Sequence, residues 1–205
     1  MNARHDYLPT SLWYKQEITD PYQVIAEFFC SAHLFSHRKC IKDVLNAAAG
    51  NFIWRKLNPG DLLHEFKMIE SIINAAYLIN KENKTSPLTI SKESSFNPNL
   101  FCGWHAHSTP WDFFPRFLTF KEYANPYVAF KRFFKYLSLA EWKNELNDLL
   151  EHALVETSLS DAGIEKDMLS LYLYFSKLIE AAHLIDVREI NHIGGHLKNR
   201  MKVRL

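Results

Sequence analysis

The chain has 205 residues, which is enough for one generous domain or two small ones. Hydrophobic residues make up 47% and charged residues 23%, so the composition is that of a globular protein and excludes a disordered one. A formal net charge of +1 excludes an overall field that would attract nucleic acid or a membrane surface. Aromatic residues reach 14%, and rings in this number can build a large core.

Helix signals divide the first half of the chain into three helices. The N-cap Asp20 opens the first, which is predicted to continue to Ala32. The second is predicted from about Ser36 to Ala49, and the third begins at Asn58, which precedes a proline. The apolar stripe of the third helix consists of Leu62, Phe66, Ile69, Ile73 and Ala76.

The second half predicts the same three helices again. Asn125 caps the first, Ser138 and Glu141 form a capping box at the second, and the third follows Gly163. The sequence is also compatible with some β structure at Leu88–Ile90 or at the C-terminus. The stripe of the third helix consists of Leu171, Phe175, Leu178, Ala182 and Ile185.

Sequence blocks about 105 residues apart repeat one another, which indicates an internal duplication. We therefore predict an all-α fold in a single domain over residues 1–205, an internally duplicated helical bundle. Its two roughly three-helix units, residues 6–80 and 112–186, are related by a pseudo-two-fold axis. One long connecting loop, the linker 81–111, joins them, and a basic C-terminal tail covers residues 187–205. The matching blocks are Asp20–Tyr22 with Asn125–Tyr127, Phe28–Phe29 with Phe133–Phe134, and Ala75–Asn80 with Ala181–Asp186.

None of the ten histidines has a histidine at the matching position of the other half, so the scaffold does not require them. His37, for example, matches Trp142. His33 and His37 are four residues apart and would share a helix face if one helix continued through Ser36. The alternative is that the histidines are surface residues or hydrogen-bonded core residues.

The segment between the repeats is the leading candidate for a functional site. Residues 81–95 are polar, whereas residues 96–112 are rich in rings and histidines and have no counterpart in the first repeat. The alternative is that these rings pack into the core. The expected ligand-binding or partner-binding residues are Trp104, His105, His107, Trp111 and Asp112.

The same segment could hold a transition metal. His105 and His107 point the same way if the chain is extended, and Cys102 or Asp112 could add a ligand. No His-Glu-x-x-His or paired Cys-x-x-Cys motif is present, so the alternative is a packed loop with histidines bonded to the backbone. Otherwise no cofactor is expected. Cys102 as a catalytic nucleophile ranks below metal binding, because nothing in the sequence indicates a reactive thiolate.

The basic tail suggests a further alternative. Lys198, Arg200, Lys202 and Arg204 could contact the phosphates of a nucleic acid. The tail could equally form an edge strand, reach a protein partner or remain solvated, because four charges are few for nucleic-acid binding.

Taken together, the sequence predicts a non-catalytic binding or interaction module that works through residues 96–112, with a protein or a small molecule as its partner. One alternative is a metal-dependent enzyme with a site at His105 and His107. The other is a nucleic-acid-associated regulator that uses the basic tail. Three cysteines without framework spacing and the lack of a signal peptide or an apolar run of about 20 residues predict a cytoplasmic protein without a membrane span.

Overall fold

The structure is a computed structural model that describes residues 10–11, 16–50, 53–55, 58–82, 88–103, 109–190, 192–193 and 196–197. Within these residues the fold is all-α apart from two pairs of two-residue strands, which confirms the predicted class. No helix among them is both long enough and apolar enough to cross a membrane. The α-helices are α1 (Pro21–Ser31), α2 (Leu34–Ala49), α3 (Pro59–Lys81), α4 (Pro110–Phe113), α5 (Phe120–Ala124), α6 (Tyr127–Tyr136), α7 (Leu139–Ala153) and α8 (Met168–Arg188).

The six longer helices are the ones that the sequence predicts, and local capping explains where they begin. The Asp20 side chain accepts hydrogen bonds from the first turn of α1, and Asn58 accepts one at the start of α3. Ser138 forms the expected capping box with Glu141 at α7. Two starts differ from the prediction. α2 begins at Leu34 rather than near Ser36, and the N-cap of α6 is Pro126 rather than Asn125, which instead ends α5.

The short elements were not predicted individually. They are the 3₁₀ helix η1 (Pro98–Leu100) with α4 and α5, and the antiparallel pairs β1 (Thr10–Ser11) with β2 (Gln16–Glu17) and β3 (His192–Ile193) with β4 (His196–Leu197). The expectation of β structure at Leu88–Ile90 is wrong, because these residues pair with no strand. The backbone N–H of Leu88 instead donates to the carbonyl of Ala124 at the end of α5. At the C-terminus, the part of the chain that the structure describes forms β structure at β3 and β4.

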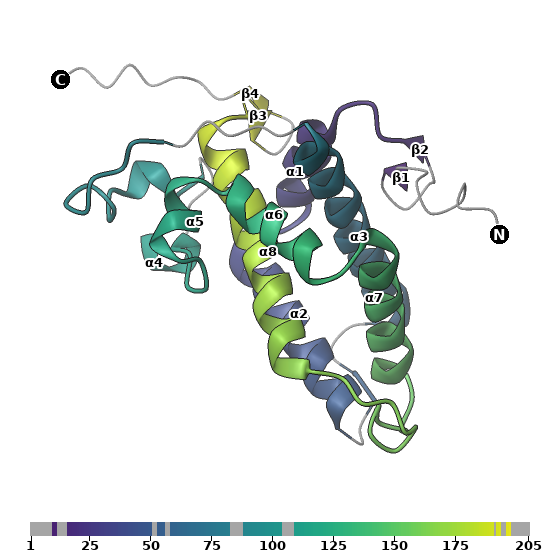
Figure 1. The fold of residues 1–205 in the computed structure, drawn as a ribbon. Coiled ribbons are helices and arrows are strands. Elements are labelled where there is room, and N and C mark those ends of the chain that lie inside the picture. The colour runs from purple at the N-terminus through teal and green to yellow at the C-terminus, as the bar shows by residue number, and fades with distance from the viewer. Residues whose placement is uncertain are drawn as a thin grey trace.

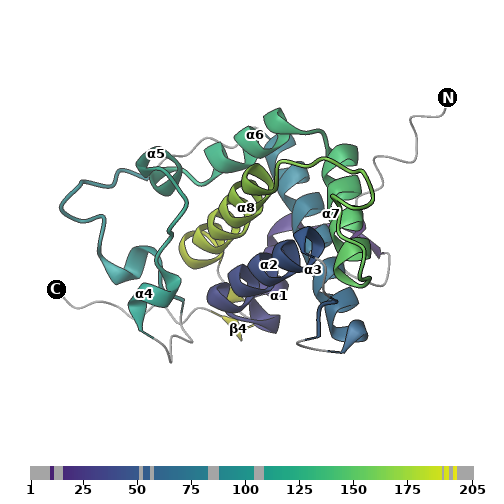
Figure 2. The same cartoon turned by 90° about the horizontal axis from the view of Figure 1, so that it is seen from below.

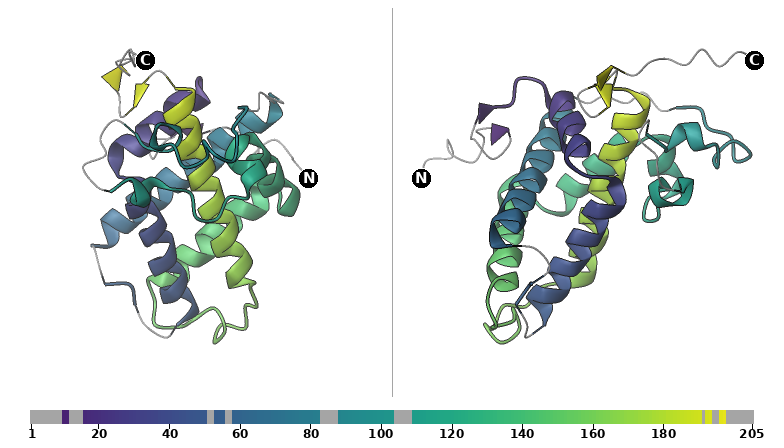
Figure 3. Two further views of the ribbon diagram at one scale, coloured as in Figure 1. Left: turned by 90° about the vertical axis from the view of Figure 1, so that its left-hand side faces the viewer. Right: turned by 180° about the vertical axis from the view of Figure 1, so that it is seen from behind.

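The six longer helices form a bundle around one large core. α2 packs against α7 and α8, and α3 packs against α1, α6, α7 and α8. α8 also contacts α1 and α6, and seen from below it lies between the segment that carries α4 and α5 and the rest of the bundle (Figure 2). α4 and α5 lie outside the bundle beside α8 (Figure 1). Both strand pairs lie toward the upper end of the bundle, as the right-hand view of Figure 3 shows.

Two stacked ring pairs join consecutive helices in the core. Trp142 on α7 stacks on Phe133 of α6 at 3.9 Å and donates its indole N–H to the Phe133 carbonyl oxygen at 3.0 Å. His37 on α2 stacks on Phe28 of α1 at 3.8 Å, and its Nε2 lies 3.3 Å from the Phe28 carbonyl oxygen. Each pair thus combines ring packing with a hydrogen bond to a carbonyl at the end of the preceding helix.

We expect Trp142→Ala to lower the free energy of unfolding by about 3–5 kcal/mol, because it removes a fully buried ring and a hydrogen bond together. Urea unfolding followed by circular dichroism measures this change. The matched control is Trp111→Ala, which removes a 63% exposed ring and should change stability by less than about 0.5 kcal/mol. Equal effects of the two substitutions would contradict the packing described here.

Candidate functional site

The structure describes some of the predicted site residues and not others. Cys102, Trp111 and Asp112 are described, whereas Trp104, His105 and His107 lie outside the described residues. The four basic residues of the tail also lie outside them; they are Lys198, Arg200, Lys202 and Arg204. The geometry of the site is therefore built from the described residues of 88–103 and 109–124.

Four rings from this region gather around Phe114, and we call the five rings together the aromatic surface. Phe96 stacks on Phe114 with 5.6 Å between the ring centroids. Phe101 and Trp111 meet Phe114 edge-on, with centroid distances of 5.1 and 5.8 Å. Tyr123 lies behind at 6.2 Å. Phe101 and Tyr123 are buried, as the core alternative predicted, but Phe96 is 61% exposed and Trp111 63% exposed. The surface therefore has a buried base and two outward rings.

A buried ion pair holds one side of this surface. Arg38 on α2 and Glu180 on α8 are 6% and 0% exposed, and their side chains lie 2.8 Å apart. The Arg38 guanidinium also donates to the carbonyls of Asp112 and Phe114. The Glu180 carboxylate accepts the backbone N–H groups of Arg116 and Phe117, both at 2.9 Å. Four hydrogen bonds thus join the backbone of residues 112–117 to side chains of α2 and α8.

Arg188, at the end of α8, holds the other side. Its guanidinium donates to the carbonyls of Leu100 and Tyr123 and lies over the Tyr123 ring at 4.5 Å. Burial lowers the pKa of Arg188, whereas burial raises the pKa of Tyr123 against an opposing effect of the guanidinium. The Tyr123 hydroxyl donates to the Ser95 carbonyl at 2.9 Å, which ties the start of the aromatic segment to the same point.

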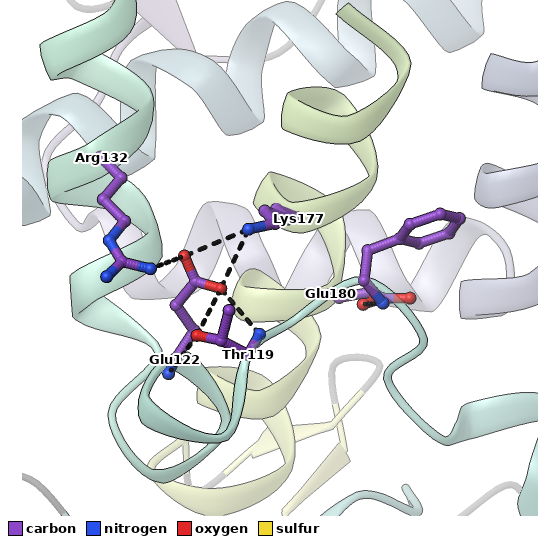
Figure 4. A network of polar contacts seen from close by, with 6 residues as sticks. Thr119, Glu122, Arg132, Lys177 and Glu180 are labelled. Carbon is purple, nitrogen blue, oxygen red and sulfur yellow. Dashed lines mark hydrogen bonds and ion pairs between the residues drawn. The ribbon is translucent and has the colours of Figure 1, made fainter. Parts of the chain in front are cut away.

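A second buried carboxylate supports α5. Glu122 is 0% exposed and accepts hydrogen bonds from the backbone and hydroxyl of Thr119 at 2.8 and 2.9 Å. Arg132 from α6 and Lys177 from α8 pair with it at 2.7 and 3.2 Å (Figure 4). Burial acts to raise the pKa of Glu122, but these donors outweigh it and hold the pKa below its ordinary value.

The metal prediction is not tested at its central residues. Cys102 is half-buried, its Sγ lies 4.0 Å from the Pro110 carbonyl, and burial raises the pKa of its thiol, which opposes the thiolate form of a metal ligand. The Asp112 carboxylate accepts a hydrogen bond from the Thr109 hydroxyl at the start of α4. Within the described part of the chain, no group of three or more potential ligands could hold a metal ion.

The suggested His33 and His37 pair does not share a site. His33 is the N-cap residue of α2, and its ring lies against Phe35 and Phe113. His37 points into the core, where it contacts Glu65 on α3. The helix break before Leu34 separates their roles.

The charged anchors of the aromatic surface were not found from the sequence. Glu180 carries a signal, because a carboxylate within the apolar run from Leu178 to Ile185 must find partners when the helix is buried. Arg38 and Arg188 carry no comparable signal, since their acceptors are backbone carbonyls far away in sequence.

Comparisons with protein-family models, with curated proteins and with solved structures found no significant match to this chain, so its function has to be inferred from the geometry.

We expect Glu180→Gln to lower the free energy of unfolding by about 3 kcal/mol, because the Arg38 charge then stays buried without a counter-charge. The matched control is Glu70→Gln, which breaks a pair between Glu70 and a half-exposed Lys67 on α3 and should change stability by less than about 1 kcal/mol. Urea unfolding of the two variants at neutral pH measures both effects. A Glu180→Gln variant as stable as Glu70→Gln would show that the anchor is dispensable.

Acid should weaken the Glu122 network. Because the folded pKa of Glu122 is lowered, its contribution to stability is present above the unfolded value of about 4.3 and is lost as the pH falls through the folded value. We therefore expect Glu122→Gln to make the loss of stability below about pH 5 shallower than in the unmodified chain. Glu151→Gln, at an exposed position of α7, should retain the steeper loss in the same acid titration of unfolding. Identical slopes for both variants would refute this role of Glu122.

Proposed function

We propose that this chain is a non-catalytic binding module whose aromatic surface docks onto another protein. The observation that carries the proposal is the exposure of Phe96 and Trp111, 61% and 63%, on a base that buried charges hold in place. Neighbouring exposed rings of this size mark interaction surfaces more often than they are incidental. Trp is also among the residues that contribute most to binding energy at protein interfaces.

A protein partner fits these rings better than a small molecule does. Small-molecule sites are concave and enclose most of their ligand. Phe96 and Trp111 each expose more than half of their surface, so they project outward and need a partner that supplies an apolar pocket for them. A protein with such a pocket would bury both rings at once, with Phe114 beneath them.

The rigid base favours affinity. Arg38 and Glu180 hold the backbone on either side of Phe114, and Arg188 holds Leu100 and Tyr123. Binding therefore requires little additional ordering of the loop, and ordering is one of the main free-energy costs of association.

We also propose that the bundle arose by the duplication that the sequence indicates. Exchange of α1 with α6, α2 with α7 and α3 with α8 converts each packing contact among these helices into another one that exists. The ring pairs Phe28–His37 and Phe133–Trp142 occupy matching positions and stack in the same way. In this proposal the two units form one domain, and three rings of the aromatic surface, Phe96, Phe101 and Trp111, belong to the linker, which has no counterpart in the first unit.

Contact between residues at matching positions further supports the duplication. Tyr22 and Tyr127 both follow the proline at the start of their helices. Burial raises the pKa of Tyr127, and its hydrogen bond with Glu189 and the neighbouring Tyr22 raise it further, so the two tyrosine side chains lie close together. Ala75, Ala76, Ala181 and Ala182 occupy matching positions of α3 and α8 and are all fully buried, and these two helices are in contact.

The other functions remain predictions. A metal-dependent enzyme at His105 and His107 and a nucleic-acid regulator that uses the tail both depend on residues outside the described ones. The cytoplasmic location and a role of Trp104 in partner binding also remain predictions.

Replacement of both outward rings should abolish partner binding without unfolding the protein. A photo-crosslinking amino acid at position 111 first identifies the partner, and its affinity for the purified chain is then measured by calorimetry. We expect Phe96→Ala with Trp111→Ala to weaken binding by at least about 30-fold, since the loss of each ring removes about 1–2 kcal/mol or more of interface energy.

The matched control is Leu169→Ala, because Leu169 is a 67% exposed apolar residue at the start of α8. It should leave the affinity unchanged. Equal affinity of the double variant and the unmodified chain would rule out the aromatic surface as the docking site.

A further inference from the structure

Basic residues are concentrated in one part of the chain. Between Asp112 and Glu141 there are five basic residues and one acidic residue, a net charge of +4 in a chain whose total is +1. The five are Arg116, Lys121, Lys131, Arg132 and Lys135. All five are exposed, whereas the acidic residue, Glu122, is 0% exposed. The outer surface of this segment therefore presents positive charge.

Three of these basic residues lie on one face of α6. Lys135 follows Lys131 by four residues and Arg132 by three, so the three side chains project from the same side of the helix. α6 contains no acidic residue that could pair with them. Like charges one turn apart destabilise a helix, so the stability of α6 does not explain this face.

The packing of the bundle does not explain it either. In the proposed duplication α6 matches α1, and both helices pack against α3 and α8. The residues of α1 that match Lys131, Arg132 and Lys135 are Ala26, Glu27 and Cys30. α1 thus packs in the same way without a basic residue, which indicates that the charges of α6 serve another purpose.

The buried carboxylate of Glu122 does not cancel the positive charge. It pairs with two cations, Arg132 of α6 and Lys177 of α8, which reach it from different helices (Figure 4). One carboxylate between two cations leaves an excess of one positive charge. The Lys177 side chain remains 25% exposed. We call the five exposed basic residues together with Lys177 the basic face.

The basic face adjoins the aromatic surface. Arg116 follows Phe114 by two residues, and the rings of Phe114 and Tyr123 lie 6.2 Å apart. Glu122 directly precedes Tyr123 and pairs with Arg132 at 2.7 Å. α5, which carries both, packs against α6 and lies beside it in Figure 2. A partner seated on the outward rings would therefore lie next to α6.

We propose that the basic face binds an acidic segment of the same protein partner that the aromatic surface docks onto. The proposal rests on the proposed function, because the outward rings are what bring the partner next to α6. Charge complementarity identifies the occupant: carboxylates of Asp and Glu side chains suit exposed lysines and arginines. Such charges at the rim of an interface act mainly on the rate of association and on the choice of partner.

A protein segment fits the basic face better than a nucleic acid does. Nucleic-acid binding combines many contacts along the phosphate backbone with rings that are free to stack on bases. The exposed ring of this face, Tyr136, is already stacked on Tyr174 with 4.3 Å between the ring centroids. One of the three basic residues of α6, Arg132, is already paired with Glu122.

The test uses a fluorescent poly-glutamate peptide of about 20 residues and the full chain at about 50 mM salt. Lys131→Gln with Lys135→Gln removes two exposed charges and leaves Arg132 with its buried partner. We expect this double variant to bind the peptide at least about fivefold more weakly, measured by fluorescence anisotropy, because each lost charge removes one pairing with a carboxylate.

The matched control is Lys39→Gln with Lys42→Gln, which removes the same number of exposed charges from α2. Its affinity for the peptide should change by less than about twofold, because α2 is not part of the basic face. Both double variants should unfold at the urea concentration of the unmodified chain, since all four positions are exposed.

Three results would overturn the proposal. One is an equal loss of affinity in the two double variants. Another is the absence of saturable binding by the unmodified chain up to about 1 mM peptide. The third is tighter binding of a uridine oligonucleotide of about 20 nucleotides that the same two substitutions in α6 weaken, which would assign the face to nucleic acid.

The partner identified through position 111 separates this inference from the proposed function. Its affinity should fall in Lys131→Gln with Lys135→Gln at about 50 mM salt, and the fall should shrink at about 500 mM salt. An unchanged affinity in this variant, with binding lost on replacement of the outward rings, would refute only the acidic segment. Peptide binding that depends on α6, with partner binding that does not depend on the rings, would refute the docking function.

Discussion

The ion pair between Arg38 and Glu180 is the constraint on which the candidate site depends. Two opposite charges buried between α2 and α8 are tolerated only when all their hydrogen-bonding capacity is used, because desolvation of each charge costs several kcal/mol. The bundle alone does not supply enough partners. The backbone of residues 112–117 supplies the rest, two carbonyls for Arg38 and two N–H groups for Glu180. A segment with little regular structure is thereby given one position.

The longer helices could be predicted because their signals are local. Asp20, Asn58 and Ser138 cap the helices that follow them, and apolar residues at helical spacing mark the buried faces. The region from Phe96 to Tyr123 could be predicted only as a candidate site. Its conformation depends on side chains that are distant in sequence, and no periodic pattern encodes such contacts.

The same limit applies to individual rings. Trp111 was expected at the site, but its sequence neighbours do not reveal that it is exposed while Phe113, two residues later, is buried. That difference is decided by whether His33, His183 or solvent lies opposite each ring. The composition indicates enough rings to build an aromatic core. Only the packing decides which rings lie in that core and which remain exposed to solvent.

In the proposed duplication, some positions carry a charged residue in one half and an uncharged residue in the other. These charged residues make polar contacts that the packing of the apolar helices does not require. Asn74 occupies the place in α3 that Glu180 occupies in α8, and Leu171 in α8 matches Glu65 in α3. The carboxylate of Glu180 binds the backbone of Arg116 and Phe117 near the start of the second unit. The charge at position 65 serves a histidine where the other half has a tryptophan.

The clamp made by Arg188 has a consequence for how the chain can change. A single guanidinium binds the carbonyls of Leu100 and Tyr123, so the backbone leaves and returns at nearly one point on α8. The entropy of closing a loop rises only slowly with its length, so insertions between Gly103 and Thr109, which leave the backbone held by Arg38 and Glu180 in place, would disturb the helices very little. Descendants of this protein could therefore acquire new binding surfaces through changes in the length and sequence of this segment, while the helical bundle stays the same.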